Sequence, residues 1–211
     1  MTKTDSLLQD YPYTEITHRL GFSQKLPYTQ NWSAEEDFIG IITDSCLANK
    51  PLTIVECSSG LTTLVLARCC QLNQQGHVFS LENGSEYVAK TTSELEQLGL
   101  SSQASILHAP LQEADIDGNS YQWYDSQKLS ALVEPIDMLV IDGPPGFIQK
   151  QSRYPALPLL ISRLAANAVV FLDDAARDDE QKIVERWLQK YPAFEHRYLE
   201  TGRGCSMLAK R

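Results

Sequence analysis

The stretch that most constrains this chain is LTIVECSSGLTT, residues 52–63. Apolar or β-branched residues at 52–55 end in the acid Glu56, small residues follow at 57–60, and residues 61–67 have helical spacing. This order predicts a β-strand, a tight turn and a helix. The small residues would let the backbone of the turn approach a ligand closely. An ordinary strand-to-helix connection with an acid at the strand end explains the stretch equally well.

A second strand that also ends in an acid favours a ligand site over an ordinary connection. Residues 77–81 follow Gly76 and end in Glu82, about 20 residues after Gly60. In a βαβ unit, a carboxylate at this place accepts hydrogen bonds from the two ribose hydroxyls of a nucleotide. A dinucleotide oxidoreductase normally carries three glycines in the first turn, because its pyrophosphate lies against the helix N-terminus. Here the turn has one glycine, and Glu56 at its head suits an ammonium group better than a pyrophosphate.

The first turn and the second strand end resemble a known family, the class I S-adenosylmethionine-dependent methyltransferases. Their first motif is an acid and two glycines at alternate positions. Glu56, Ser58 and Gly60 match it, except that serine replaces the first glycine, and Glu82 matches the ribose acid. The departure at Ser58 concerns the backbone of the turn, where we expect a serine to keep to a region allowed for residues with a side chain.

The resemblance covers roughly residues 32–210. The segments IDGPPG, residues 141–146, and FLDDA, residues 171–175, look like one branch of the family, the small bacterial-type methyltransferases related to the catechol-type O-methyltransferases. The resemblance implies transfer of a methyl group from S-adenosylmethionine to a small-molecule acceptor, with a hydroxyl group as the accepting site. It also implies that the cofactor is bound by Glu56, Ser58, Gly60, Thr62, Glu82, Asn83, His108 and Asp142.

The predicted fold class is α/β, with a Rossmann-like, doubly wound, mostly parallel seven-stranded sheet, an antiparallel final strand and helices on both faces. Residues 1–31 are expected to form an N-terminal arm, mostly irregular with one short helix, over the active-site side. Residues 32–211 are expected to form a single domain. Beyond the two strands above, we expect strands at 104–108, 136–141, 168–172, 194–199 and 205–209, and helices at 85–98, 154–165 and 177–191.

Two local patterns allow further predictions. Ser33 to Glu36 have the pattern of a capping box, which predicts the start of the helix before the first strand. Residues 112–135 hold turn-forming residues flanked by aromatic ones, which suits either a hairpin or a surface loop whose aromatic residues pack on the sheet edge. We prefer the surface loop.

Acids recur at the ends of the predicted parallel strands, at Glu56, Glu82, Asp142 and the pair Asp173 and Asp174. The carboxyl ends of parallel strands share one edge of the sheet, so these side chains should converge on one crevice. Because converging carboxylates repel one another, they need a cation, a shared proton or strong hydrogen-bond donors.

The resemblance implies one such cation. In the catechol-type relatives, acids at the positions of Asp142, Asp173 and Asp174 bind a divalent metal that holds and acidifies the substrate hydroxyl. Ligand sets made of oxygen atoms suit Mg²⁺ or Mn²⁺. Two alternatives stay open. Asp174 could cap the next helix while Asp142 hydrogen-bonds to the proline turn, or a metal-free site could use Asp142 or Asp174 as the catalytic base.

Composition limits the partners. The net charge of −9 and the pI of about 4.9 disfavour nucleic acid as a partner. No window of the sequence predicts a membrane span or a signal peptide, and the five cysteines at 46, 57, 69, 70 and 205 form no CxxC pair. We therefore expect a small-molecule acceptor, no membrane contact and a reducing, cytoplasmic location; the sequence indicates no oligomeric state.

Two other classes of protein are compatible with the predicted doubly wound α/β fold. One is a Rossmann-type nucleotide-binding oxidoreductase or epimerase, which the acid and the missing glycines of the first turn disfavour. The other is a non-catalytic member of the family that binds the cofactor without turnover, which Ser58 supports best.

Overall fold

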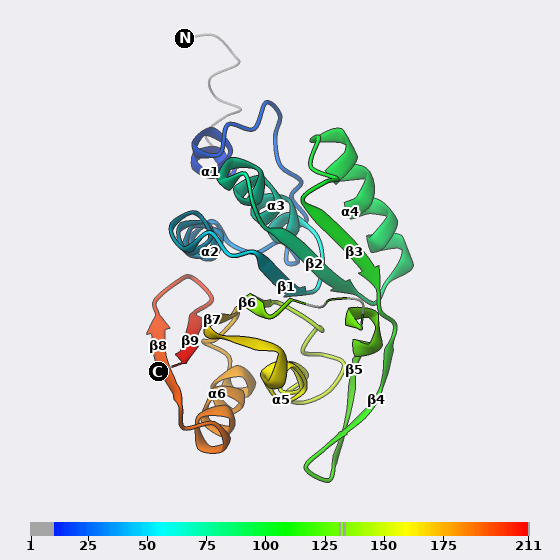
Figure 1. The fold of residues 1–211 in the computed structure, drawn as a ribbon, viewed down its shortest axis with the longest axis vertical. Coiled ribbons are helices and arrows are strands. Elements are labelled where there is room, and N and C mark those ends of the chain that lie inside the picture. Colours follow the sequence, from blue (N-terminus) through cyan, green and yellow to red (C-terminus); the bar gives the residue numbers. More distant parts are fainter. Residues whose placement is uncertain (1–10, 131, 133, 211) are drawn as a thin grey trace.

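The computed structural model describes residues 11–130, 132 and 134–210 (Figure 1). Its centre is a seven-stranded sheet in the order β3-β2-β1-β6-β7-β9-β8. The strands are β1 Thr53–Cys57, β2 His77–Glu82, β3 Ala104–His108, β6 Ile136–Ile141, β7 Leu164–Leu172, β8 Phe194–Leu199 and β9 Cys205–Lys210. The first five strands of that order run parallel, and β9 runs antiparallel to both of its neighbours. The predicted fold class is confirmed.

Helices cover both faces of the sheet, as Figure 1 shows. They are α1 Thr14–Arg19, α2 Glu36–Asn49, α3 Leu61–Asn73, α4 Ser85–Gln97, α5 Ala156–Leu160 and α6 Asp178–Lys190. Alternate residues of each central strand point to opposite faces. Thus Ile54 and Val140 belong to the core under α1 to α4, whereas Val55 and Leu139 belong to the core over α5 and α6. This arrangement fixes the central strands on both sides and positions their carboxyl ends at one edge.

The helix before β7 is shorter than the sequence predicts. Instead of a helix over 154–165, α5 ends at Leu160, a 3-10 turn spans Ile161–Arg163, and β7 already begins at Leu164. Arg163 donates to the carbonyl oxygens of Leu129 and Leu132, which holds the turn. Leu164 then pairs with Ile136 at the start of β6. Strand pairing and these hydrogen bonds therefore override the local helical pattern.

The predicted capping box is also wrong. Helix α2 begins at Glu36 with Glu35 at its N-cap, and no side chain caps it. The Ser33 hydroxyl instead accepts a hydrogen bond from the amide of Thr29, at 2.9 Å. Glu36 accepts from the amide of Ile16 at 3.4 Å, so the acid contacts helix α1 of the arm in place of its own N-terminus.

Residues 112–135 contain a hairpin, so the surface loop that we preferred is wrong. Strands β4, Leu111–Ile116, and β5, Asn119–Tyr124, pair antiparallel and extend away from the main sheet (Figure 1). Their two-residue turn is Asp117 and Gly118, with φ of 56° and 77°. Asp-Gly with both φ values positive is the turn that matches the twist of a hairpin. The hairpin carries Tyr124, whose buried side chain reaches the loop after β6.

The N-terminal arm contains the one short helix that the sequence predicts, α1. Residues 1–10 lie outside the described residues. The hydroxyl of Tyr13 donates to the carbonyl oxygen of Ala34 at 2.8 Å, and Ile16 and Leu20 are buried in the core beside α2 and α3. The arm is therefore packed onto the domain.

The contact between the hairpin and the loop after β6 predicts that position 143 tolerates only glycine without a loss of stability. A Cβ at this position would collide with the Tyr124 hydroxyl and lie 3.0 Å from Cβ of Ser58. Because Tyr124 is buried and cannot swing away, Gly143→Ala should lower the free energy of unfolding by about 1–3 kcal/mol in chemical denaturation. The control is Gly146→Ala in the same loop, where a Cβ meets open space. Equal stability of the two variants would contradict the packing described here.

Candidate active site

Two cavities adjoin at the carboxyl ends of the parallel strands. The first has a volume of about 420 Å³ and is lined by the turn after β1, the end of β2, one face of α4 and the N-terminal arm. The second has a volume of about 620 Å³ and lies toward the loops after β6 and β7. Both volumes suit small molecules. The cavities share a wall formed by Trp32, Ser58, Asp142, Pro145 and Phe147.

The predicted cofactor residues fall mostly in the first cavity. Its lining includes Ser58, Gly60, Thr62, Glu82, Asn83 and Asp142. Pro27 and Thr29 also line it, so the arm lies on the active-site side as the sequence predicts. His108 ends β3 with an exposed side chain, and the structure brings it to neither cavity. Glu56 lines neither cavity.

The first turn has the conformation of a glycine turn although it holds a serine. Ser58 has φ of 101°, and Gly60 has φ of 142°. Residues with a Cβ rarely adopt a φ near 100°, so the expectation that Ser58 keeps to an ordinary allowed region is wrong. The amide of Ser58 donates to the carbonyl oxygen of Leu81 at 3.0 Å, which fixes the turn against β2. The strain at Ser58 is therefore imposed by the sheet.

Glu56 holds the turn from behind. Its carboxylate is fully buried and accepts hydrogen bonds from the hydroxyls of Thr62, Thr63 and Ser80. Burial raises the pKa of Glu56 to about 7, although these three hydrogen bonds lower it. Thr62 stands between Glu56 and the first cavity, because it lines the cavity while its hydroxyl donates to the acid. Glu56 thus orders the start of α3 and orients Thr62 in the wall of the first cavity.

Glu82 is held in place by its neighbours while facing the first cavity. Its Oε2 accepts from the amide and the hydroxyl of Ser59 at 3.1 and 2.9 Å, and its Oε1 accepts from the amide of Gly84 at 2.9 Å. A carboxylate has about four lone-pair sites, so Oε1 can still accept from a ligand. The side chain is 5% exposed. The acid therefore presents a fixed acceptor to the cavity.

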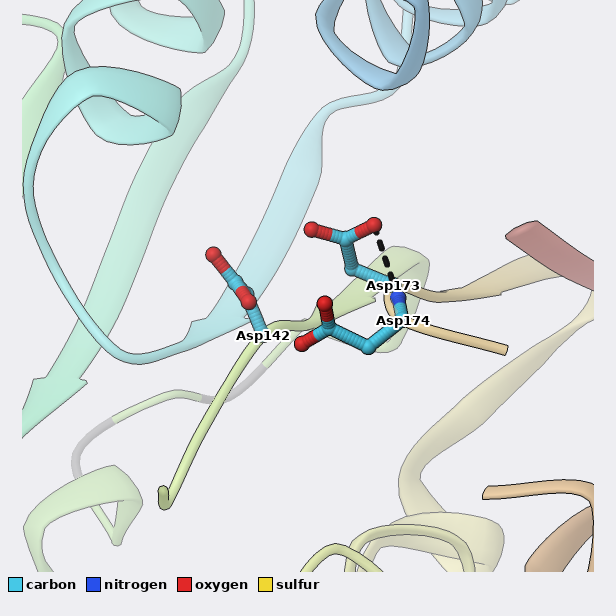
Figure 2. Close-up of side chains that lie close together, drawn as sticks. All are labelled: Asp142, Asp173 and Asp174. Atoms are coloured by element: carbon cyan, nitrogen blue, oxygen red, sulfur yellow. Dashed lines mark hydrogen bonds between the residues drawn. The ribbon is translucent and has the colours of Figure 1, made fainter. Parts of the chain in front are cut away.

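Asp142, Asp173 and Asp174, called here the acid cluster, lie together at the ends of β6 and β7 (Figure 2). Each has one carboxylate oxygen within 4.8 Å of those of the other two. Burial and the neighbouring acids raise the pKa of Asp142 to about 6 and the pKa of Asp173 to about 8. Both shifts show that burial and mutual repulsion disfavour the ionisation of all three acids together.

Three arginines surround the acid cluster. Arg153 is buried and donates from Nη2 to Asp174 Oδ2 at 2.9 Å and to Asp142 Oδ1 at 3.3 Å. Arg177 Nη1 lies 2.9 Å from the same oxygen of Asp174, and Arg203 Nε lies 3.6 Å from its Oδ1. All three arginines thus lie within ion-pair distance of Asp174, and Arg153 also pairs with Asp142.

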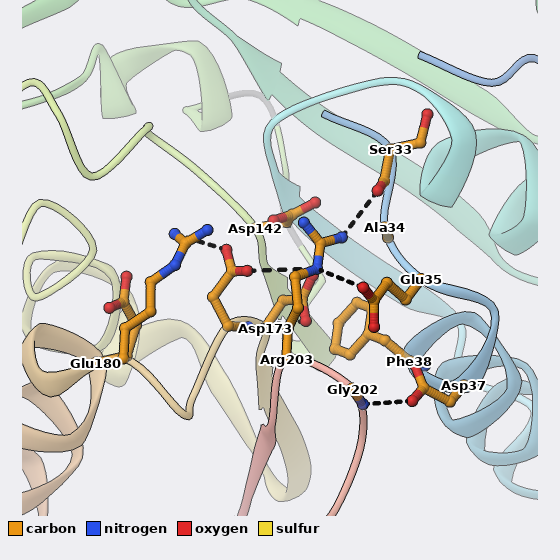
Figure 3. Close-up of polar contacts among 12 residues, drawn as sticks. Ser33, Ala34, Glu35, Asp37, Phe38, Asp142, Asp173, Glu180, Gly202 and Arg203 are labelled. Atoms are coloured by element: carbon orange, nitrogen blue, oxygen red, sulfur yellow. Dashed lines mark hydrogen bonds and ion pairs between the residues drawn. The ribbon is translucent and has the colours of Figure 1, made fainter. Parts of the chain in front are cut away.

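Arg203 connects the acid cluster to the residues just before α2. Figure 3 shows it between the acids and the start of α2. Its Nη2 donates to the carbonyl oxygen of Ser33 at 2.8 Å, and its Nε lies 3.7 Å from Glu35 Oε1. The neighbouring amide of Gly202 donates to Asp37 at 2.6 Å. The loop between β8 and β9 therefore closes the site beside the arm.

The helix-capping alternative for the acids is not what the structure shows. The N-cap of α6 is Arg177, and no side chain caps that helix. The Asp142 carboxylate takes its hydrogen bond from Arg153 and none from the proline turn. The acids at the ends of β6 and β7 are thus held by arginine.

A family model described as a methyltransferase domain matches residues 55–175, more than half of the chain. The chain belongs to this methyltransferase family. The matched region of the methyltransferase contains the first turn, Glu82 and the whole acid cluster. No curated protein matches its sequence.

Solved structures share the fold of the methyltransferase. An O-methyltransferase from Bacillus cereus, in complex with S-adenosylhomocysteine (SAH), has a TM-score of 0.68 at 18% identity, and the match covers 98% of this chain and 91% of that one. A SAH-bound methyltransferase from Podospora anserina has a TM-score of 0.68 at 12% identity, over 99% and 96% of the two chains. An O-methyltransferase from Streptomyces achromogenes, in complex with S-adenosylmethionine (SAM), has a TM-score of 0.65 at 12% identity, over 100% and 92%.

The sequence analysis missed several lining residues of the methyltransferase. Tyr87, Lys90, Thr91 and Glu94 face the first cavity from α4. Their spacing of three and four residues places them on one helix face, and a helix that follows the Glu82 strand directs that face toward the site. This signal was present in the sequence. Ser59, which fixes Glu82, carried no comparable signal.

The strained turn gives a testable prediction for Ser58→Gly. Glycine tolerates a φ of 101° without strain, which should outweigh its greater freedom in the unfolded chain. The free energy of unfolding should therefore rise by about 1 kcal/mol, and cofactor binding should be retained or tightened. The control is Ser101→Gly at an exposed serine without positive φ, which should gain nothing. A loss of cofactor binding in Ser58→Gly would show that the hydroxyl itself is needed.

Proposed function

We propose that this methyltransferase transfers the methyl group of S-adenosylmethionine to a hydroxyl group of a small molecule. The observation that carries the proposal is the pair of adjoining cavities, with Glu82 fixed in the first and Asp142 in the wall between them. Proteins with the same fold include O-methyltransferases in complex with SAH or SAM, which supports the same chemistry here.

The first cavity is the proposed cofactor site. Glu82 would accept from the ribose hydroxyls through Oε1, with Asn83 beside it in the lining. The N-terminus of α3, after Gly60, suits the carboxylate of the cofactor's methionine part, because backbone amides and the positive end of the helix dipole favour an anion there. Thr62, oriented by Glu56, lies in the same wall.

The second cavity is the proposed acceptor site. S-adenosylmethionine supplies an activated methyl group, so the protein has to align the acceptor, exclude water and remove the acceptor's proton. The acceptor oxygen attacks the methyl carbon while the bond from that carbon to sulfur breaks, and the electron pair of that bond stays on sulfur. Asp142 would take the hydroxyl proton, because it lines both cavities and is ionised at neutral pH. Asp174 also borders this cavity, but its ion pairs with Arg153 and Arg177 make it a weaker candidate for the base.

The expected partners and location stay part of this proposal. Within the described residues, no helix is both long and apolar enough to cross a membrane. All five cysteines are buried and none forms a disulfide, which fits the cytoplasm that we propose. The net charge of −9 supports a small-molecule acceptor over nucleic acid.

The oxidoreductase or epimerase alternative is not favoured. A Tyr-x-x-x-Lys pair on one helix face would support such an enzyme. Tyr124 and Lys128 have this spacing, but Tyr124 ends a strand and Lys128 lies in a 3-10 turn, so they do not share a helix face. Lys128 is also paired with Asp125 at 3.8 Å. A member that binds the cofactor without turnover is separated from an enzyme by the rate measurement below.

The cofactor site is tested by calorimetry with S-adenosylmethionine and SAH on wild type and Glu82→Ala. Loss of a charged acceptor for the ribose should weaken binding by about 1.5–3 kcal/mol, roughly 10-fold to 150-fold. Glu86→Ala is the matched control, because Glu86 is exposed on α4 outside both cavities. If wild type binds NAD and neither of these ligands, the assignment of this cavity is wrong.

The base is tested by methyl transfer to a panel of hydroxylated acceptors. Asp142→Asn should lower kcat by about 100-fold or more, with a loss of cofactor affinity of tenfold at most. Wild-type activity should rise as pH increases through about 6, because the pKa of Asp142 is raised to about 6 and only its ionised form accepts a proton. Asp44→Asn, at an exposed acid of α2 outside both cavities, serves as the control. An Asp142→Asn variant with full activity would exclude Asp142 as the base.

A further inference from the structure

We propose that Arg153 is a built-in cation that holds the acid cluster in place of a divalent metal ion, so that this chain binds no metal there. A corollary is that methyl transfer needs no metal, and this corollary rests on the proposed function. The claim that no metal binds to the acid cluster does not rest on it. The family resemblance implied Mg²⁺ or Mn²⁺ between Asp142, Asp173 and Asp174, beside the alternatives of helix capping and a metal-free base. The structure places a guanidinium group against two of these acids.

Arg153 reaches both strand ends from one position. Its side chain is 3% exposed. Nη1 donates to the carbonyl oxygen of Asp173 at 2.9 Å, and Nη2 donates to the carbonyl oxygen of Asp142 at 2.7 Å. Nη2 also contacts Asp174 Oδ2 and Asp142 Oδ1 at 2.9 and 3.3 Å. One planar cation therefore bridges the ends of β6 and β7 through backbone and side-chain oxygens.

A metal ion that bridged Asp142 and Asp174 would compete with Arg153, which already contacts one carboxylate oxygen of each acid. Mg²⁺ requires near-octahedral geometry at about 2.1 Å and keeps several waters. Asp173 and Asp174 are 1% and 2% exposed, so an ion bound to both would have to give up waters that Mg²⁺ releases reluctantly. The guanidinium would also repel a dication at this distance. The residues present therefore do not fit the metal that the resemblance implies.

The arginines around the acid cluster also favour a site without a metal ion. Arg153, Arg177 and Arg203 all lie within 4 Å of Asp174. Arg153 lies 3.9 Å from Glu180 as well. Three cations near one carboxylate already offset part of the repulsion between the acids, which lowers the need for a dication.

Two carboxylate oxygens of the acid cluster are still available as metal ligands. Asp173 Oδ2 and Asp174 Oδ1 are buried without a hydrogen-bond partner among the described residues. A metal that entered despite Arg153 would bind through these two oxygens. Loss of binding in Asp173→Asn and Asp174→Asn would therefore identify a metal in the cluster and exclude one elsewhere on the surface.

Arg153 is also a positioning residue for Asp142. It holds Oδ1 of the carboxylate that lies between the two cavities, so its loss should disturb the base without touching the cofactor. Arg153→Met should thus lower kcat while leaving cofactor affinity within about threefold. Arg153→Lys should recover part of kcat, because an ammonium group keeps the charge but not the fork of donors.

The test titrates Mn²⁺ into chelator-treated full-length protein and follows free Mn²⁺ by electron paramagnetic resonance. Wild type should show no binding up to about 1 mM. Arg153→Met should gain binding that the added Asp173→Asn removes. Arg163→Met is the matched control, because Arg163 holds main-chain oxygens away from the cluster, and it should gain none.

The proposal would be overturned if wild type binds Mn²⁺ and either Asp173→Asn or Asp174→Asn abolishes that binding. This measurement does not depend on whether Arg153→Met folds. A folded Arg153→Met that binds no Mn²⁺ would also overturn the proposal, because the guanidinium would then not be what keeps the metal out. Undiminished wild-type methyl transfer in excess chelator supports the corollary, and its loss contradicts it. If no hydroxylated acceptor is methylated at all, the proposed function fails while the Mn²⁺ result stands.

Discussion

The arrangement of the active site depends on one buried guanidinium between two strand ends. A parallel sheet brings the residues that follow β6 and β7 to the same edge, and in this chain those residues are acids. Arg153 makes that arrangement stable by binding the carbonyl oxygens of both strand ends and the carboxylates beyond them. Removing one partner of a buried ion pair typically costs about 3–5 kcal/mol, a large share of a domain's stability. The position of Asp142, and with it the wall between the two cavities, follows from this contact.

The rest of the site is held by hydrogen bonds inside the protein. Glu56 orders the start of α3 through hydroxyl groups, and Ser59 and Gly84 fix Glu82. The strained Ser58 completes the turn between them. A ligand in the first cavity thus meets groups that are already oriented, which reduces the entropy lost on binding. The wall that both cavities share is different, because its aromatic residues Trp32 and Phe147 are exposed.

Sequence patterns predicted the parts of this architecture that depend on strand order. The apolar runs before Glu56, Glu82 and Asp142 marked buried parallel strands, and the rule that such strands share an edge brought the acids together. Arg153 stood out in the sequence only as a candidate for substrate contact or for pairing with an acid at a helix end. The sequence could not reveal which acids it joins, because the fold alone brings Asp142 and Asp174 together. Local patterns failed where a tertiary contact took over, as when the Ser33 hydroxyl bonded to Thr29 in place of capping α2. The Asp-Gly turn of the hairpin was visible in the sequence, and there our choice of a surface loop was the error.

The most direct test of this account is a crystal structure of the protein grown with SAH and Mn²⁺, with anomalous diffraction recorded at the manganese absorption edge. The account predicts the ribose hydroxyls on Glu82, the Arg153 guanidinium between Asp142 and Asp174, and no anomalous peak among Asp142, Asp173 and Asp174. An anomalous peak between those three carboxylates, with Arg153 displaced, would contradict it.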